Sequence, residues 1–221
     1  MAQYDKELFA VPEGFDTLKN GVTYGKIAEI SYDSKTTGTT RKANIIFPPN
    51  YDAGKKYPVL YLLHGIGGDH NEWLGAELVY VLSNLVAEGE AKSMITVIPN
   101  VRARANDAGN PQDIYTLGHY KAFDNFINDL KDDLMPYIEA NYPVLTGKEN
   151  TAIAGLSMGG RETLYIGCTM PDTFGYIGAF TPAPGLLPYT NFGVSEDGLF
   201  TTETLTLPKD SDNFVMINAG I

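Results

Sequence analysis

Short apolar runs alternate along this chain with longer amphipathic segments and polar turns. Continuous apolar runs predict strands that are buried on both faces of a parallel sheet. These runs are residues 57–63, 94–99, 151–154, 176–180 and 213–219. Two alternating segments, 26–32 and 41–47, flank a break at residues 36–39, and this pattern predicts an antiparallel hairpin.

Helical periodicity occurs in three segments between the predicted strands. The first begins near Asn71 and ends at Gly89. The second, residues 123–142, is the strongest, and its acids are expected opposite the apolar stripe. Pro136 is expected either to kink this helix or to shift its ridge of side chains. The third follows Gly159. The stripe of the second helix consists of Phe123, Phe126, Ile127, Leu130, Leu134 and Ile138.

This alternation of strands and helices predicts a single α/β domain over residues 1–221. We expect a mostly parallel central sheet with helices on both faces and an N-terminal antiparallel hairpin. Ligands bind at the carboxyl ends of the strands in such sheets. Residues 1–24 are expected to form an irregular cover, and the loop-rich segments 102–118 and 182–212 are expected to shape specificity.

The composition narrows the range of partners. With 16 Lys and Arg against 27 Asp and Glu, the formal net charge is −11, and the basic residues form no cluster. This charge argues against nucleic acid and anionic membrane surfaces, and it suits a neutral or weakly charged substrate. No apolar run is long enough to span a membrane. The single cysteine, Cys168, excludes an internal disulfide and is expected to be a buried structural thiol.

The strongest chemical signal lies in residues 150–164. An apolar strand leads into the sequence G-L-S-M-G at residues 155–159, and a helical pattern follows. This is the context in which G-x-S-x-G presents a nucleophilic serine on a strained turn, with small residues required on either side. The alternative is a glycine-rich turn that contains a serine by chance. We interpret Ser157 as the nucleophile.

A serine nucleophile needs a base, and it needs donors for the oxyanion of the tetrahedral intermediate. The N–H of Met158, directly after the nucleophile, is the first expected donor. The second should come from the loop after an earlier strand, and the sequence H-G-I-G-G at residues 64–68 follows such a strand. We assign it to the Ile66 N–H. Neither a cofactor nor a metal is expected.

The three histidines are weaker candidates for the base. His64 stands at a strand end before a glycine, where a histidine usually braces the loop by hydrogen bonds, so catalysis is its less favoured role. His70 and His119 are expected in loops, with exposed side chains.

Asp69, Trp73 and Arg161 are candidates for the mouth of the site, and Asp69 and Trp73 for contacts with the substrate. Trp73 could supply an apolar wall for an aromatic or sugar group, or it could be a core residue on a helix face. The sequence favours neither alternative.

The order of the triad along the chain raises a difficulty. In this fold the acid and then the histidine follow the nucleophile, but no histidine follows Ser157. None of the later acids comes directly after a buried strand, and a last strand and covering helix are also missing. We therefore expect a fragment without its C-terminal part, in which the strand near residue 217 carries an open edge.

Five stretches form a specific combination: residues 57–68 (YPVLYLLHGIGG), Trp73, 97–100 (VIPN), 134–142 (LMPYIEANY) and 152–160 (AIAGLSMGG). Together they resemble carbohydrate esterase family one, the feruloyl and acetylxylan esterases. These are α/β hydrolases of plant cell-wall degradation, related to esterase D and the mycolyltransferases. The resemblance covers most of residues 25–221.

The resemblance implies a secreted serine esterase, often one module beside a xylanase, although the N-terminal sequence M-A-Q-Y-D predicts no signal peptide. It implies Ser157 as nucleophile, with Ile66 and Met158 as the oxyanion amides. The expected substrate is feruloylated xylan, with acetylated xylan as the first alternative. A non-catalytic module that binds carbohydrate or a partner, and an acyltransferase that uses a sugar hydroxyl instead of water, are further alternatives.

Overall fold

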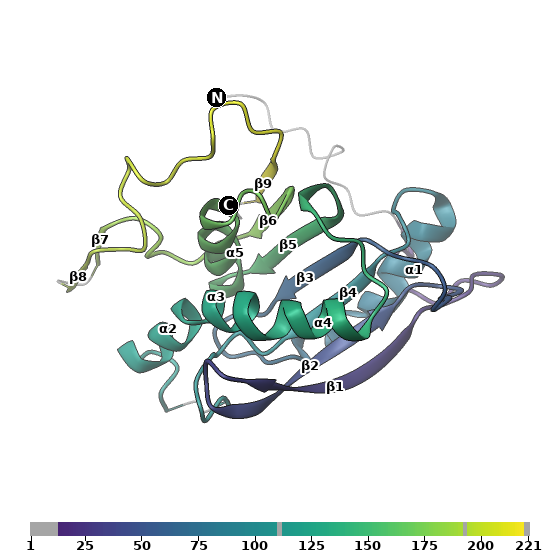
Figure 1. Ribbon diagram of the computed structural model, residues 1–221, viewed down its shortest axis with the longest axis horizontal. Helices are drawn as coiled ribbons and strands as arrows, with labels where there is room; N and C mark the ends of the chain where they lie inside the picture. Colours follow the sequence, from purple (N-terminus) through teal and green to yellow (C-terminus); the bar gives the residue numbers. More distant parts are fainter. Residues whose placement is uncertain (1–12, 110–111, 192–193, 219–221) are drawn as a thin grey trace.

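The computed structural model describes residues 13–109, 112–191 and 194–218, and Figure 1 shows a central sheet with helices packed against it. Within these ranges, seven strands form the sheet in the order β1-β2-β4-β3-β5-β6-β9. Their bounds are Lys26–Ser34 (β1), Thr39–Phe47 (β2), Val59–Leu63 (β3), Ile95–Pro99 (β4), Thr151–Leu156 (β5), Tyr176–Phe180 (β6) and Phe214–Asn218 (β9). A separate hairpin consists of Tyr189–Asn191 (β7) and Val194–Glu196 (β8).

The pairing of the strands confirms the predicted sheet. β1 and β2 form an antiparallel hairpin in which Lys26 lies opposite Phe47, and β2 pairs antiparallel with β4. From β4 to β9, every neighbouring pair in the described sheet is parallel. The carboxyl ends of β3 and β5 therefore lie side by side, with Leu63 opposite Gly155. Residue 219, the last of the final predicted strand, lies outside the described ranges.

Neighbouring residues of the central strands pack on opposite faces of the sheet. Leu63 and Val97 belong to the larger core, which includes the apolar stripe of the helices after β4. Leu62 and Ile98 belong to a second core beneath α1 (Leu78–Glu88). Because both faces are covered, these strands are continuously apolar, as the sequence predicts.

The helices confirm the predicted positions with some differences at their ends. A 3₁₀ turn, Glu72–Ala76 (η2), precedes α1, and Gly89 ends α1 in the left-handed region at a φ of 78°. None of the helices in the described ranges has the length and apolar content needed to cross a membrane. The helical elements that follow α1 are α2 (Leu117–Asp124), α3 (Phe126–Asp129), a π turn η3 (Leu130–Leu134), α4 (Met135–Asn141), a 3₁₀ turn η4 (Lys148–Asn150) and α5 (Met158–Thr169). Cys168 on α5 is only partly buried, and burial raises the pKa of its thiol.

The predicted helix over residues 123–142 is instead a series of shorter elements, α2 to α4. Its apolar stripe is buried as expected, from Phe123 to Ile138. Pro136 has no N–H to donate, and the π turn Leu130–Leu134 lies directly before α4, so the expected disturbance takes the form of a change in helical pitch.

The expectation that all acids of this segment face away from the core is wrong for Asp129 and Asp133, which are buried. Asp129 accepts a hydrogen bond from the Tyr32 hydroxyl at 2.6 Å and lies 3.5 Å from Nε of Arg41. Asp133 accepts from the Ser34 hydroxyl at 3.2 Å. Both carboxylates therefore attach the helix to the β1–β2 hairpin, a partnership that periodicity alone does not reveal.

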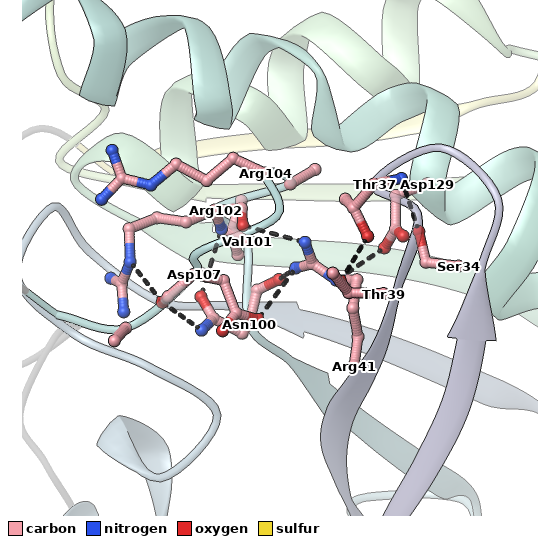
Figure 2. A network of polar contacts seen from close by, with 12 residues as sticks. Ser34, Thr37, Thr39, Arg41, Asn100, Val101, Arg102, Arg104, Asp107 and Asp129 are labelled. Atoms are coloured by element: carbon pink, nitrogen blue, oxygen red, sulfur yellow. Dashed lines mark hydrogen bonds and ion pairs between the residues drawn. The ribbon is translucent and has the colours of Figure 1, made fainter.

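Arg41 extends this buried network to the loop after β4 (Figure 2). Its Nη1 donates to the Arg102 carbonyl oxygen at 2.9 Å, and its Nη2 donates to the Asn100 carbonyl oxygen. The Asn100 side chain in turn donates to the Asp107 carbonyl oxygen at 2.9 Å. The loop at the carboxyl end of β4 is therefore fixed by the hairpin behind it.

The turn between β5 and α5 is as tight as the glycine spacing predicts. Ser157 has a φ of 53° and a ψ of −118°, an uncommon backbone conformation for a residue with a side chain. A Cβ on Gly159 would lie 2.5 Å from the carbonyl oxygens of both Leu63 and His64, and a Cβ on Gly155 would lie 2.5 Å from the Gly159 oxygen. Larger residues are excluded at both positions.

The last described strand differs from expectation. All five residues of β9 are exposed, including Phe214 (59%) and Ile217 (58%), so the prediction of a buried strand is wrong for this region. The physical reason is that β9 pairs with β6 at the edge of the described sheet and no described helix covers its faces. The open edge predicted near residue 217 is present among the described residues.

Replacing Arg41 should destabilise the fold far more than replacing the next residue of β2. Arg41→Leu leaves the Asp129 carboxylate buried without its counter-charge, so we expect the free energy of unfolding to fall by about 3–5 kcal/mol in urea denaturation. Lys42 pairs with Glu29 on the surface, where the two side chains are 56% and 46% exposed. Lys42→Leu should change the free energy by about 0.5 kcal/mol or less. Equal losses of unfolding free energy in the two variants would contradict the role of Arg41 as the buried counter-charge of Asp129.

The strain at Ser157 should be measurable with two variants that both lack the hydroxyl. Ser157→Gly relieves the positive φ, whereas Ser157→Ala retains it. We expect the glycine variant to unfold with a free energy about 1 kcal/mol higher than the alanine variant. Urea denaturation at neutral pH checks this, and an alanine variant at least as stable as the glycine variant would argue against a strained turn.

Candidate active site

The carboxyl ends of β3 and β5 bring the two predicted catalytic segments together. β5 ends one residue before Ser157, and β3 leads directly into residues 64–68, the loop that contains Ile66. A Cβ built on Gly65 would lie 3.6 Å from the Cβ of Ser157. The 64–68 loop therefore packs against the serine.

The backbone of Ser157 is held on both sides, while its hydroxyl is free. Its N–H donates to the Phe180 carbonyl oxygen at 2.9 Å, and its carbonyl oxygen accepts from the N–H groups of Arg161 (3.0 Å) and Ala183 (2.9 Å). The side chain is partly exposed, and within the described ranges Oγ makes no hydrogen bond. This hydroxyl can meet an ester, but its proton needs a base from elsewhere.

Two backbone amides are placed to receive an anion near Ser157. Met158 begins α5, and the first N–H groups of a helix have no acceptor within it. In the 64–68 loop, the Gly65 N–H donates to Oε2 of Glu72 at 2.6 Å and the Gly68 N–H donates to the Gly65 oxygen at 3.2 Å. The Ile66 N–H donates to no acceptor in the described part of the chain. The amides predicted for the oxyanion are thus among those left free.

His64 braces this loop, as its position before a glycine predicts. Its ring is fully buried, with Nδ1 2.7 Å from the Gly65 carbonyl oxygen and Nε2 accepting from the Val101 N–H at 2.8 Å. This pattern needs a neutral ring with its proton on Nδ1. Burial lowers the pKa of His64 to about 4, which favours the same state. Both ring nitrogens are occupied, so His64 has no free lone pair for Ser157.

The other two histidines are less exposed than predicted, His119 being fully buried and His70 partly buried. His119 lies in α2 with a fully buried ring, and its Nε2 is 2.8 Å from the Ile66 carbonyl oxygen. The His70 side chain is 12% exposed, and its Nε2 lies 3.1 Å from a carboxylate oxygen of Glu29. Neither contact follows from local sequence, because each partner is at least 41 residues away.

Two further residues that support the 64–68 loop were not identified from the sequence. Glu72 binds the Gly65 N–H, and an acid in the turn after a glycine-rich loop is the signal that could have found it. Arg102, expected in a surface loop, is 1% exposed and donates from Nη1 to the Gly68 carbonyl oxygen (Figure 2 shows its link to Asp107 and Asn100). The exposed Glu72 and the buried Arg102 thus hold this loop from two sides.

Asp69 and Trp73 have structural partners. Oδ1 of Asp69 accepts from the Asn71 N–H at 2.7 Å, and Nε1 of Trp73 donates to the Leu63 carbonyl oxygen at 3.0 Å. The indole packs against the core beneath α1, so of the two alternatives for Trp73 the core position is the one observed. Contact of either residue with a substrate stays a prediction.

A cavity of about 340 Å³ opens beside the start of α5. Ser157, Met158 and Ile66 are not among its described lining residues. The lining approaches the serine through Arg161, one turn along α5, and through Pro184, which follows the residue that binds the Ser157 carbonyl oxygen. Of the three residues predicted at the mouth, only Arg161 lines this cavity. Its aromatic and apolar lining comes from Tyr115, Leu117, Tyr120, Pro184, Tyr189 and Leu199.

The charges of this cavity largely cancel. Nη1 of Arg161 donates to Asp124 at 2.5 Å and also to Glu162, which is fully buried on α5. Burial raises the pKa of Glu162 to about 8. The remaining charged residue of the lining is Asp197. Because Arg161, the one cation among the described lining residues, is already paired, the cavity suits a neutral polar or aromatic group better than an anion.

A base for Ser157 is not found among the described residues. His64 uses both ring nitrogens in buried contacts, the fully buried ring of His119 is held through Nε2 by the Ile66 carbonyl oxygen, and His70 is paired with Glu29. No histidine follows Ser157 in the sequence. The site therefore combines a free hydroxyl with free amides, and the proton acceptor is missing from the part that the structure shows.

Comparison with known proteins identifies relatives of this arrangement. Residues 34–204 match the esterase family model, described as putative esterase. The chain is 34% identical over 178 residues to the endo-1,4-beta-xylanase/feruloyl esterase of Xylanibacter ruminicola, covering 78% of this chain and 24% of the relative. It is 25% identical to endo-1,4-beta-xylanase Y of Acetivibrio thermocellus, covering 76% of this chain and 15% of that protein. The chain thus spans about a quarter or less of these relatives.

Solved structures give a stronger match. The chain is 41% identical to the CE1 ferulic acid esterase of Anaeromyces mucronatus, solved in complex with ferulic acid. The TM-score is 0.85, and the match covers 94% of this chain and 77% of that one. The sheet order and the strand-turn-helix at Ser157 accord with the α/β-hydrolase fold of that family. This chain therefore belongs to the esterase family and, within it, to carbohydrate esterase family one, with the α/β-hydrolase fold.

Proposed function

We propose that this chain is the nucleophile-bearing part of a serine esterase that hydrolyses ester decorations of plant cell-wall xylan, with ferulate as the preferred acyl group. The observation that carries the proposal is the free hydroxyl of Ser157 on a strained turn, packed against a loop with an unpaired Ile66 amide. The relatives named feruloyl esterase support the substrate class.

The proposed reaction passes through an acyl-enzyme. Oγ of Ser157 attacks the ester carbonyl, and the N–H groups of Met158 and Ile66 bind the oxyanion that forms. The sugar alcohol leaves with a proton, and water then releases the carboxylic acid from Ser157. Substrate orientation is assigned to the cavity beside α5.

We further propose that the base and the acid of the triad come from polypeptide outside these 221 residues. Two observations support this. No described group accepts a hydrogen bond from Ser157 Oγ, and the match to the Anaeromyces mucronatus enzyme covers only 77% of that chain. The setting that we propose is extracellular, with xylanase modules in the same polypeptide, as the name of the Xylanibacter ruminicola relative indicates for that protein.

The size and lining of the cavity favour ferulate over acetate. A volume of about 340 Å³ falls within the range of small-molecule sites and far exceeds what an acetyl group needs. Tyr115, Tyr120 and Tyr189 line the cavity, and aromatic side chains are the residue type that packs against a phenolic ring or a sugar. Acetylxylan esterase activity is the alternative that the same nucleophile allows.

A non-catalytic binding module is the second candidate, favoured by the absence of a base beside Ser157 in the described part. Such a module would use the same cavity for carbohydrate without turnover. Labelling and hydrolysis separate the two functions, because a serine without a base does not react rapidly with either kind of reagent.

Ser157 should be the residue that reacts. In the product of the open reading frame that contains this chain, we expect a fluorophosphonate to label Ser157, and methyl ferulate to be hydrolysed faster than acetylated xylan. Ser157→Ala should abolish labelling and lower kcat/KM at least about a thousandfold. Ser31→Ala, on the exposed face of β1, is the matched control and should retain full activity. Hydrolysis that survives in Ser157→Ala would refute the assignment.

Acid should weaken the fold through His64. Its pKa of about 4 in the folded state lies below the ordinary value of 6.5, so the unfolded state takes up the proton first as the pH falls. The stabilisation is complete above pH 6.5 and is lost toward pH 4. Between pH 6.5 and 4.5 we expect about 2 kcal/mol of loss from this group alone. Urea denaturation of wild type and His64→Gln should show the smaller pH slope in the variant; identical slopes would count against a neutral buried His64.

A further inference from the structure

The direction of the Ile66 N–H is set by the peptide group that it shares with the Gly65 carbonyl. The N–H and C=O of a trans peptide point in opposite directions in one plane, so fixing the oxygen aims the N–H. The Gly65 oxygen is fixed by Nδ1 of His64 at 2.7 Å and by the Gly68 N–H at 3.2 Å. One side of Ile66 is therefore held by a buried histidine.

The other side of Ile66 is held by a second buried histidine. The Ile66 carbonyl oxygen belongs to the following peptide group, and it lies 2.8 Å from Nε2 of His119. A carbonyl oxygen only accepts, so Nε2 of His119 must carry the proton. With both flanking peptide groups fixed, neither backbone dihedral of Ile66 can rotate without breaking a buried hydrogen bond.

His119 is itself oriented by its surroundings. Its Nδ1 lies 3.4 Å from Oδ1 of Asp113, and neither atom has a hydrogen-bond partner in the described structure. The other carboxylate oxygen of Asp113 accepts from Nη2 of Arg104 at 2.9 Å. The ring packs on Phe123, with centroids 5.3 Å apart, and Thr116 caps the helix by accepting from the His119 N–H. The helix cap thus constrains the backbone of His119, and the contact with Phe123 constrains the plane of its ring.

We propose that His119 is a positioning residue of the oxyanion hole, which holds the Ile66–Gly67 peptide group through Nε2 and so keeps the Ile66 N–H aimed at the substrate oxygen. Asp113 faces the ring from the Nδ1 side at 3.4 Å, and its charge sets the electrostatic environment of the imidazole. His119 is fully buried and is not among the residues that line the cavity, so it acts only through Ile66. The proposal rests on the esterase function proposed above.

The position of His119 in α2 gives this role a further consequence. Leu117 and Tyr120, on either side of it in the sequence, line the cavity beside α5. One short helix therefore contacts the space assigned to the substrate and also holds the residue assigned to the oxyanion.

The decisive comparison is between His119→Gln and His119→Asn in the product of the open reading frame. The glutamine amide can reach the position of Nε2 and donate to the Ile66 oxygen, whereas the shorter asparagine amide reaches only the position of Nδ1. We expect His119→Asn to lower kcat on methyl ferulate about tenfold to a hundredfold, with KM within about twofold of wild type. His119→Gln should recover most of the loss.

A purely structural role would give a different pattern. If His119 only stabilised the fold, its variants would contain less folded protein and show less total activity. The kcat per labelled active site would then stay unchanged, and His119→Asn would not be slower than His119→Gln. Equal kcat in folded His119→Asn and wild type, or equal impairment of the glutamine and asparagine variants, would overturn the proposal.

A second measurement does not depend on turnover. In ¹H–¹⁵N spectra, the amide signals of Ile66 and Gly67 should move in His119→Asn and return toward wild type in His119→Gln. Unmoved signals would overturn the positioning role even if the enzyme is active. If the signals respond as expected but wild type hydrolyses no ester, the proposed function fails while the role of His119 in fixing Ile66 stands.

Asp113→Asn provides a test that leaves the buried ring of His119 in place. The Asp113 side chain is 27% exposed, so the substitution does not change a fully buried position. It removes the charge that faces Nδ1. We expect a shift of the imidazole Nδ1 resonance and a severalfold fall in kcat with little change in KM. Wild-type kcat together with an unchanged Nδ1 resonance would overturn the part assigned to Asp113.

Discussion

The close approach of two backbone segments, the carboxyl end of β3 and the first turn of α5, is the constraint on which the rest of the site depends. The carbonyl oxygens of Leu63 and His64 occupy the space that a side chain on Gly159 would need. This contact sets the separation between the 64–68 loop and Ser157. The uncommon backbone conformation of Ser157 persists because this packing and the hydrogen bonds on its two peptide groups over-determine it.

A loop rich in glycine has few side chains with which to order itself, so its order comes from neighbouring elements. In this chain the 64–68 loop is held by polar groups that reach it from η2, α2 and the loop after β4, through Glu72, His119 and Arg102. His119 and Arg102 are buried, and burying such groups is favourable only when they are hydrogen-bonded. Behind them, Arg41 ties the loop after β4 to the hairpin, so the antiparallel edge of the sheet supports a site at its centre.

The sequence predicts those features that depend on neighbours along the chain. Apolar runs locate the strands of the sheet, and the glycine spacing around Ser157 locates the tight turn, because both patterns arise from local burial and local sterics. The sequence does not predict the buried positions of Asp129, Arg102 and His119, because each depends on a partner far along the chain. The exposure of β9 is not predicted for a related reason. An apolar run indicates that a strand tends to be buried, but it does not show whether another element packs against that strand.

The buried carboxyl group of Glu162 has a consequence for the electrostatics of α5. The N-terminal end of a helix carries a partial positive charge, and at this end the Met158 amide lies beside Ser157. Burial raises the pKa of Glu162, and the guanidinium of Arg161 on the same helix donates to its carboxyl group. The acid is thus engaged within the helix, and the positive end of the macrodipole remains available to a negative charge that develops at the hydroxyl of Ser157.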